Sequence, residues 1–147
     1  MKKIKLHNFL SIIIAFSIIL IDQIIKLFVK QNLKDSIPII KNIFHLTLVY
    51  NQGAGFGILH GQRIILILFS LIIFAGIIYK WNKIPEKKGI SIPLGLLLGG
   101  LVGNLIDRIL RGYVIDFLDF RIWPVFNLAD SAITISVIWL IIILWKN

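Results

Sequence analysis

Two aspartates in the last third of the chain, Asp116 and Asp130, have the residue type for acid–base chemistry. Two carboxyl groups that share a shielded site hold one proton between them, because charging both is costly. The ionised acid can take a proton from a water molecule that attacks a carbonyl carbon. The protonated acid can hydrogen-bond the carbonyl oxygen and then supply a proton to the leaving amine. If the fold brings them together, the two acids predict hydrolysis of a peptide bond with water as the nucleophile.

Each acid also has an interpretation of its own. In residues 127–130 (Asn-Leu-Ala-Asp) the asparagine is placed as a helix N-cap and Asp130 as the third helical residue, an ordinary capping arrangement. Asp116 lies on the apolar face of a predicted strand, where an acid needs a partner, whereas Asp119 points the other way as a solvated or paired rim residue. The dipole of the last helix favours a charge on Asp130, which would make Asp130 the base and Asp116 the acid.

Further polar side chains lie near the ends of the apolar segments. Asp22 and Lys26 are one helical turn apart, which indicates either a pair that faces inward as part of a site or a structural ion pair whose lysine also reaches the membrane interface. Asn104, Asp107 and Arg108 share a helix face, and Arg108 could hold a carboxylate or meet a lipid phosphate. A charge at the centre of a membrane helix costs roughly 2.5–3.5 kcal/mol. Because these groups fall at one depth, we expect them to form a common site.

The composition predicts a protein embedded in a lipid bilayer. Hydrophobic residues make up 58% of the 147 residues and charged residues 16%, against about 45–50% and about 25% in soluble domains. The apolar residues come in long blocks, and a chain this short has too little interior to bury them all. The same apolar content excludes a disordered chain. We expect a single membrane-embedded domain over residues 1–147.

Four apolar blocks approach the length of about 20 residues that crosses a bilayer. They cover about residues 9–29, 64–79, 90–110 and 128–145. Gly95, Gly99 and Gly103 recur at four-residue steps, which allows a neighbouring helix to approach closely. Lysines are denser in the first seven residues and in the link 80–89 than in the long link 30–63, so both termini are predicted to be cytoplasmic. The first block has no cleavage site and is expected to be an uncleaved anchor.

The two links on the outer side carry strand patterns. Around residues 38–57 and 114–123, apolar and polar side chains alternate, which predicts strands with one apolar face. We expect a small sheet on the outer membrane surface whose apolar face rests on lipid or on a substrate. The predicted fold is mainly α: an integral membrane bundle of four transmembrane helices with a small β-sheet cap on the outer face.

Several other kinds of site find little support. The chain has no cysteine, which excludes disulfides and thiol nucleophiles, and its three histidines are scattered. We therefore expect no metal and no organic cofactor, and we expect no serine with a histidine nearby. The net charge of +9 does not indicate nucleic acid, because lysines that flank apolar blocks fit a membrane protein better.

Two classes other than a hydrolase remain open. A small ion-coupled transporter would use intramembrane acids as a relay, but its charges should lie near the midplane rather than near one rim. A non-enzymatic holder of lipid or peptide would need the apolar surface and Arg108 but not both acids. Separate substitution of Asp116 and Asp130 distinguishes these classes from a hydrolase.

Four segments of the chain resemble those of the lipoprotein signal peptidase family, the bacterial signal peptidase II. They are residues 22–26 (Asp-Gln-Ile-Ile-Lys), 51–57 (Asn-Gln-Gly-Ala-Gly-Phe-Gly), 99–108 leading into 112–117, and 126–130 (Phe-Asn-Leu-Ala-Asp). The last two, in this order and spacing, are specific to the family, and the resemblance covers essentially the whole chain. Two departures bear on the loop and sheet geometry: Gly55 stands where many members have alanine, and the stretch 117–129 between the two acids is short.

The resemblance implies an aspartyl endopeptidase of the cytoplasmic (inner) membrane. Family members remove the signal peptide from a prolipoprotein whose lipobox cysteine carries diacylglycerol, at the outer face of that membrane, and globomycin-type peptides inhibit them. The family's catalytic pair maps onto Asp116 and Asp130. Residues that would line or support the site are Asn51, Gly53, Asn104, Arg108, Asn127, Asp22, Lys26 and Asp107. The implied partners are the diacylglyceryl-prolipoprotein and membrane lipids, whereas the lipobox preference and the oligomeric state stay open.

Overall fold

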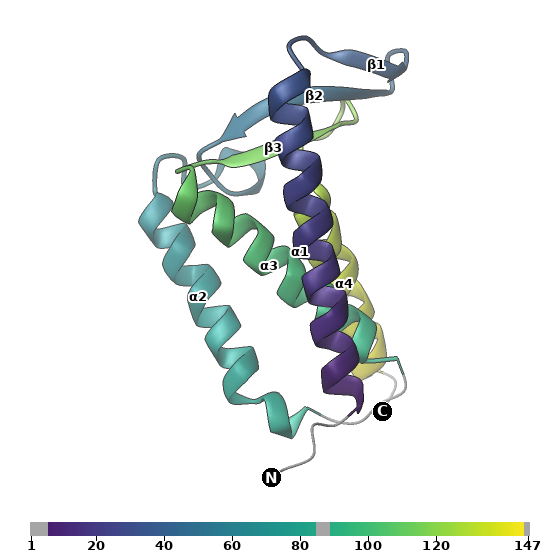
Figure 1. Cartoon of the computed structure of the whole chain (residues 1–147), viewed down its shortest axis with the longest axis vertical. Helices are drawn as coiled ribbons and strands as arrows, with labels where there is room; N and C mark the ends of the chain where they lie inside the picture. Colours follow the sequence, from purple (N-terminus) through teal and green to yellow (C-terminus); the bar gives the residue numbers. More distant parts are fainter. Residues whose placement is uncertain (1–5, 85–88, 146–147) are drawn as a thin grey trace.

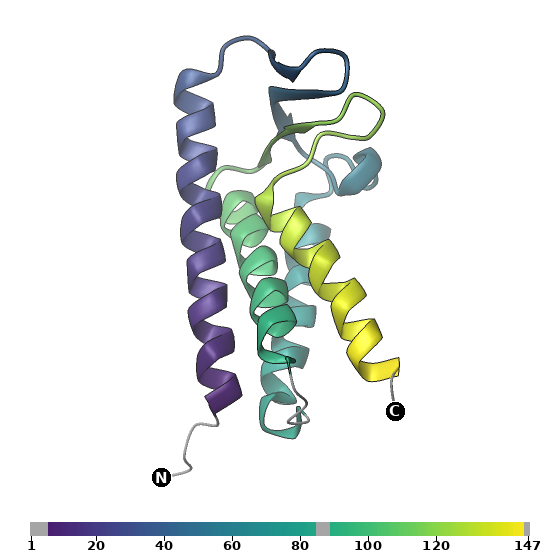
Figure 2. The same cartoon turned by 90° about the vertical axis from the view of Figure 1, so that its right-hand side faces the viewer.

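The computed structural model describes residues 6–84 and 89–145, which form four α-helices beneath a small sheet (Figures 1 and 2). The helices are α1 (Leu6–Asn32), α2 (Arg63–Tyr79), α3 (Ser91–Leu110) and α4 (Leu128–Trp145), with short 3₁₀ turns η1 (Gly55–Gly57) and η2 (Trp81–Lys83). The four predicted helices are therefore confirmed, with ends that differ by a few residues. Some of the lysines behind the predicted orientation lie outside the described residues, namely Lys2, Lys3, Lys5, Lys87 and Lys88.

Three of these helices are long and apolar enough to cross a membrane: Asn8–Asn32, Ser91–Leu110 and Leu128–Trp145. Helix α2 has 17 residues, which span about 25 Å at a rise of about 1.5 Å per residue. That is at the short end of what crosses the hydrocarbon core. Large apolar side chains point away from the protein on α1 and α2, where Phe16 is 66% exposed and Ile72 69% exposed. A surface of this kind is stable against lipid rather than water, as in a multi-pass membrane protein.

Helix α3 is central because its glycines let two neighbours pack closely. A Cβ at Gly95 would lie 2.6 Å from the Cβ of Ile14 in α1, and a Cβ at Gly100 would lie 2.5 Å from the backbone oxygen of Ala129 in α4. The close approach predicted from the glycine spacing is thus confirmed. Helix α2 packs mainly on α3 and stands apart from α1 and α4 (Figure 1).

The sheet contains β1 (Ile37–Ile40), β2 (Phe44–Asn51) and β3 (Val114–Asp119) in antiparallel order β1-β2-β3. The register sets Val49 opposite Asp116, which fixes the position of this acid on the sheet. The strand regions predicted at 38–57 and 114–123 are confirmed in place but were drawn too long.

Both strands end earlier than predicted because the backbone turns. Strand β2 stops at Asn51, whose side-chain oxygen accepts the backbone N–H of Gly53 at 2.8 Å and so turns the chain away from the ladder. Strand β3 stops before Arg121, which has a φ of +65°, a left-handed conformation incompatible with a continuing strand.

The apolar face of the sheet packs partly on the protein's own first helix. Leu46 and Leu48 of β2 contact a buried cluster that includes Val29 and Leu33 near the end of α1. This part of the face is therefore not available to lipid or substrate, contrary to the expectation from sequence. The packing fixes the sheet over the ends of the helices.

The beginning of α1 and the end of α4 lie at the end of the molecule opposite the sheet (Figures 1 and 2). Helices α1 and α3 therefore run towards the sheet, and α2 and α4 run away from it. This arrangement brings the last turns of α1 and α3 and the first turn of α4 to the same level, as the polar residues in these turns predicted.

Candidate active site

A cavity of about 580 Å³ lies between the sheet and the sheet-side ends of the helices, and both Asp116 and Asp130 line it. Asp116 comes from β3 and Asp130 from the first turn of α4. Asn51 of β2 and Arg108 of α3 line the same cavity. The structure thus brings together the two acids that the sequence predicted as a pair.

Asp116 is held by two amide side chains in a buried setting. Its two carboxylate oxygens accept hydrogen bonds from Asn51 Nδ2 at 2.8 Å and from Asn127 Nδ2 at 2.7 Å, and the residue is 1% exposed. Burial, followed by the negative charge of Asp130, raises the pKa of Asp116 to about 7, and the two amide donors limit that rise. Asp116 is therefore a carboxyl group that can carry a proton near neutral pH.

Asp130 sits in a capping box at the start of α4. Its backbone N–H donates to Asn127 Oδ1 at 2.8 Å, and its carboxylate accepts the backbone N–H of Asn127 at 3.3 Å. The other carboxylate oxygen accepts Asn104 Nδ2 at 2.7 Å. The predicted capping role is confirmed, and it does not compete with the cavity role because the same side chain serves both.

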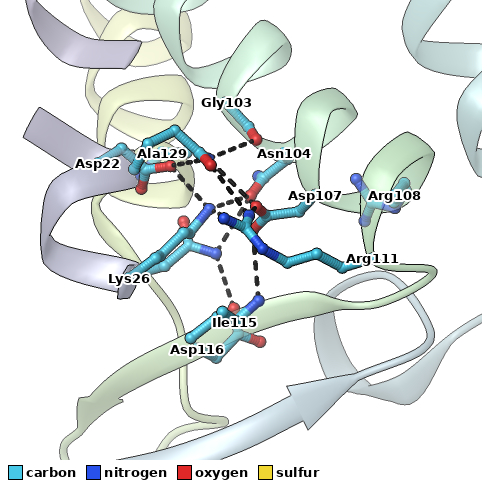
Figure 3. A network of polar contacts seen from close by, with 12 residues as sticks. Asp22, Lys26, Gly103, Asn104, Asp107, Arg108, Arg111, Ile115, Asp116 and Ala129 are labelled. Carbon is cyan, nitrogen blue, oxygen red and sulfur yellow. Dashed lines mark hydrogen bonds and ion pairs between the residues drawn. The ribbon is translucent and has the colours of Figure 1, made fainter. Parts of the chain in front are cut away.

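Lys26 is the centre of a buried ion-pair network behind the cavity (Figure 3). Its Nζ lies 2.7 Å from Asp22 Oδ2 and 2.9 Å from Asp107 Oδ2, and it donates to Asn104 Oδ1 at 3.2 Å. The interpretation of Asp22 and Lys26 as an ion pair is confirmed. The part of that interpretation in which Lys26 also reaches the membrane interface is wrong, because Lys26 is fully buried between these partners.

Asp22 also links the first helix to the last. Its second carboxylate oxygen accepts the backbone N–H of Ala129 at 3.0 Å. That N–H belongs to the first turn of α4, where backbone donors have no partner within the helix. Asp22 therefore caps α4 from outside and fixes the turn that carries Asp130.

The network includes two residues that the site prediction did not contain. Gln23 Nε2 donates to Asp107 Oδ1 at 3.1 Å and to the backbone oxygen of Gly103 at 3.2 Å. Arg111 pairs with Asp107 and donates to Gln23 Oε1 at 2.9 Å. The four-residue spacing of Asp107 and Arg111 was a readable signal of this pair.

Arg108 and Gly53 meet at the edge of the cavity. Arg108 Nη2 donates to the backbone oxygen of Gly53 at 3.2 Å, so the guanidinium joins α3 to the loop after β2. Arg63, at the first position of α2, donates from Nε to the backbone oxygen of Arg108 at 2.6 Å and from Nη2 to that of Ile109 at 2.9 Å. Arg63 thus caps the end of α3, a role that was not predicted.

Asp119 lies outside the pair, as predicted. It accepts the hydroxyl of Thr47 at 2.8 Å, and it forms an ion pair with Arg121 at 3.0 Å. Of the two roles expected for a rim residue, the paired one is correct.

The prediction that no serine lies near a histidine is wrong. Ser36 Oγ is 3.1 Å from His45 Nδ1 and 2.8 Å from Thr47 Oγ1. The pairing of β1 with β2 brings the two residues together across the hairpin. Ser36 is exposed and does not line the cavity that holds Asp116 and Asp130.

The comparisons with known proteins decide the family. A family model described as signal peptidase (SPase) II matches residues 14–146. The chain belongs to the signal peptidase II family. Family relatives include the lipoprotein signal peptidase of Halothermothrix orenii, 48% identical over 137 residues, which cover 92% of this chain and 94% of the relative. The lipoprotein signal peptidase of Desulfitobacterium hafniense is 47% identical over 128 residues, which cover 84% of this chain and 85% of the relative.

Solved structures agree with this membership. A bacterial membrane enzyme at 2.3 Å resolution superposes with a TM-score of 0.86 at 36% identity, covering 92% of this chain and 87% of the other. A second at 1.9 Å gives a TM-score of 0.83 at 36% identity and covers 93% of both chains. The resemblance derived from the four sequence motifs is confirmed, and the described geometry belongs to a peptidase family.

Proposed function

We propose that the protein is an aspartyl endopeptidase that removes signal peptides from diacylglyceryl-modified prolipoproteins. Its family membership supports a protease that acts on prolipoproteins. The observation that carries the catalytic type is that Asp116 and Asp130 line one cavity and are linked by the side chain of Asn127. Two acids in this relation suit activation of water without a covalent intermediate.

The environments of the two acids suggest different roles. Asp116 is buried, with its pKa raised to about 7, and it is the acid that carries the shared proton. Asp130 lies in the first turn of α4, where the helix dipole favours a negative charge. In the proposed reaction, Asp130 takes a proton from water while the water oxygen bonds to the scissile carbonyl carbon.

The proton of Asp116 hydrogen-bonds the carbonyl oxygen during this attack. When the C–N bond breaks, a proton passes from the acid pair to the leaving nitrogen. The products are the carboxyl end of the signal peptide and the amino group of the lipid-modified cysteine. Atoms and charge balance with water as the sole co-reactant.

Supporting roles follow from the contacts. Asn51 and Asn127 position the carboxylate of Asp116, and Asn104 positions that of Asp130. Arg108, held by Gly53, offers a positive charge at the cavity edge. The buried groups behind the cavity hold these residues in place; they are Asp22, Lys26 and Asp107.

We further propose four membrane spans, with both termini in the cytoplasm and the sheet at the outer face of the cytoplasmic membrane. This placement is supported by the start of α1 and the end of α4, which share the end away from the sheet (Figure 1). Lys80 and Lys83 follow α2 at that end, as the preference of lysine for the cytoplasmic side requires. Globomycin-type peptides are expected to inhibit by occupying the cavity between the two acids.

Separate substitution of each acid tests the proposal. Cleavage of a diacylglyceryl-modified precursor in membranes is measured as the loss of the precursor band on a gel. Asp116→Asn and Asp130→Asn should each abolish this cleavage, so the precursor band should persist. Asp119→Asn is the matched control, because it removes a carboxylate from the same strand outside the cavity, and it should retain cleavage. Turnover by either of the first two variants would refute the catalytic pair. Loss in all three, with a folded protein, would indicate a general structural effect instead.

A further inference from the structure

A small cavity joins the catalytic cavity to the space between the helices. It measures about 170 Å³ and lies between α2, α3 and α4, and both Asp130 and Arg108 line it as well as the larger cavity. Its remaining walls are mostly apolar and include Leu66 and Phe69 of α2 and Ile133 of α4. A peptide bound at Asp130 can therefore continue into the space between these helices.

The same three helices, together with Lys80 and Ile84 beyond α2, line an open and mainly apolar cavity of about 450 Å³ further from the sheet. On α3 the residues that line the two cavities follow one another at steps of three or four, and on α4 Leu140 follows Ile133 after seven residues, or two turns, so on each helix they lie on one face. On α2 this face consists of Leu66, Phe69, Ser70, Ile73, Gly76 and Ile77. We name the combined feature the α2–α4 groove, with α3 as its floor.

Gly76 in the wall of this groove is not explained by packing within the described chain. Glycine inside a helix costs roughly 0.5–1 kcal/mol relative to alanine. The glycines of α3 that are discussed above are in close contact with a neighbouring helix, as Gly95 is with Ile14, whereas a Cβ at Gly76 would meet nothing within 4 Å. Gly76 therefore leaves open space in the wall of the groove.

A second apolar cavity, of about 560 Å³, lies on the other side of α2. Its walls include Phe16 of α1, Ile78 of α2 and Val102 of α3, and it shares no lining residue with the catalytic cavity. Of the two apolar grooves found beside α2 in the described residues, the α2–α4 groove is the one that leads to Asp130.

We infer that the α2–α4 groove binds the apolar segment of the signal peptide as a helix. This inference rests on the proposed function. The α2 wall from Leu66 to Ile77 is about 16 Å long at about 1.5 Å per residue. The apolar core of a signal peptide has about 7–15 residues, and as a helix it has a length similar to that of this wall. Because that core precedes the cleavage site, a helix in the groove directs its outer end to Asp130.

The absence of cysteine from the chain allows a direct test. Single cysteines at Ile73 or Leu140, in the groove, and at Ile12 or Phe16, in the other cavity, are labelled with benzophenone maleimide in liposomes of phosphatidylethanolamine and phosphatidylglycerol. These enzymes also carry Asp116→Asn, which prevents turnover of the precursor. Each labelled enzyme is illuminated in the presence of a diacylglyceryl-modified precursor, and the cross-linked residues of the precursor are then mapped by mass spectrometry. We expect most of the adduct on the apolar part of the signal peptide from Ile73→Cys and Leu140→Cys, and little from the other two.

A steric variant provides an independent measurement. Gly76→Trp fills the groove, whereas Ile78→Trp, two residues away on α2, fills the other cavity. With active enzyme, Gly76→Trp should raise the KM for the precursor about tenfold while kcat changes little, because it removes binding that the ground state and the transition state share. Ile78→Trp should leave both constants near those of the unmodified enzyme.

The outcomes separate this inference from the proposed function. If the single-cysteine enzymes with both acids intact fail to cleave the precursor while the unmodified chain also fails, the proposed function is wrong. If they cleave it, but adducts form equally in both cavities or mainly from Ile12→Cys and Phe16→Cys, the assignment of the groove is overturned. An unchanged KM for a folded Gly76→Trp enzyme would overturn it as well.

Discussion

Asn127 donates to one carboxylate oxygen of Asp116 at 2.7 Å, and its own side-chain oxygen accepts the backbone N–H of Asp130 at 2.8 Å. The Asn127 side chain therefore fixes both the start of α4, which carries Asp130, and the orientation of the Asp116 carboxylate on β3. The separation of the two acids depends on a residue that is itself a helix cap.

Replacement of Asn127 should separate its two roles. Asn127→Ala loses both the cap and the donor to Asp116, so we expect a loss of about 0.5–2 kcal/mol in the free energy of unfolding together with a large fall in kcat. Asn127→Ser keeps a capping hydroxyl but not the amide donor, so it should be more stable than the alanine variant and equally poor in kcat. Thermal unfolding in detergent and steady-state kinetics provide the two readouts. Full activity in the serine variant would show that the bond to Asp116 is dispensable.

Activity should fall as the pH rises through about 7. The proposed mechanism needs a proton on Asp116. Burial and the charge of Asp130 raise the pKa of Asp116 to about 7, so that proton is lost above this value. In Asn127→Ser the alkaline limb of the profile should move to higher pH, because a donor that favours the charged form of Asp116 is gone. A profile that stays flat to pH 9 would contradict the role given to Asp116.

The free energy of unfolding should fall between about pH 4 and pH 7. A carboxyl group with a raised pKa binds its proton more tightly in the folded state than in the unfolded one, so the folded state loses stability as the pH rises through that window. Asp116→Asn cannot titrate and should lack this part of the slope. Melting temperatures of both proteins at several pH values in one detergent check the difference; identical slopes would rule out Asp116 as its source.

Removal of Lys26 should destabilise the protein strongly. Lys26→Met leaves the buried carboxylates of Asp22 and Asp107 without their common cation, and breaking a buried ion pair of this kind costs about 3–5 kcal/mol. Lys30→Met, one helical turn later, is the control. Lys30 is exposed and its described hydrogen bond is to Tyr113 Oη, so the change in the free energy of unfolding should stay within about 0.5 kcal/mol. Thermal unfolding of the two variants gives the comparison, and equal effects would show that the buried network contributes little.

Alanine at two glycines should have opposite effects. In Gly99→Ala the new Cβ would lie 2.7 Å from the Cβ of Ile18, and such overpacking costs about 1–3 kcal/mol. In Gly76→Ala the Cβ meets open space, so the better helix propensity should stabilise by about 0.5–1 kcal/mol. Melting temperatures decide; a stabilised Gly99→Ala would mean that α1 and α3 can move apart without cost.

The helices and the convergence of Asp116 and Asp130 were predictable because their signals lie within single elements. Apolar blocks gave the helices, and the face on which Asp116 lies, together with the place of Asp130 at a helix start, indicated that the two acids converge. The capping box needed no more than the spacing of Asn127 and Asp130.

Contacts that depend on tertiary structure were not predictable in the same way. Gln23 and Arg63 donate to backbone oxygens of another helix, and a backbone acceptor leaves no mark in the sequence. Ser36 and His45 meet because of the register between β1 and β2, which shifts between Pro38 and Ile40. A register of this kind depends on the turn and on the packing below the sheet.

The hydrogen bond from Ala129 to Asp22 joins residues 107 positions apart. During synthesis, a chain that has been made only as far as α3 holds this carboxylate without the turn of α4 that it anchors. Asp130 lies in that same turn, so under the proposed mechanism the peptide bond can be cleaved only after α4, the last helix to be synthesised, has joined the bundle.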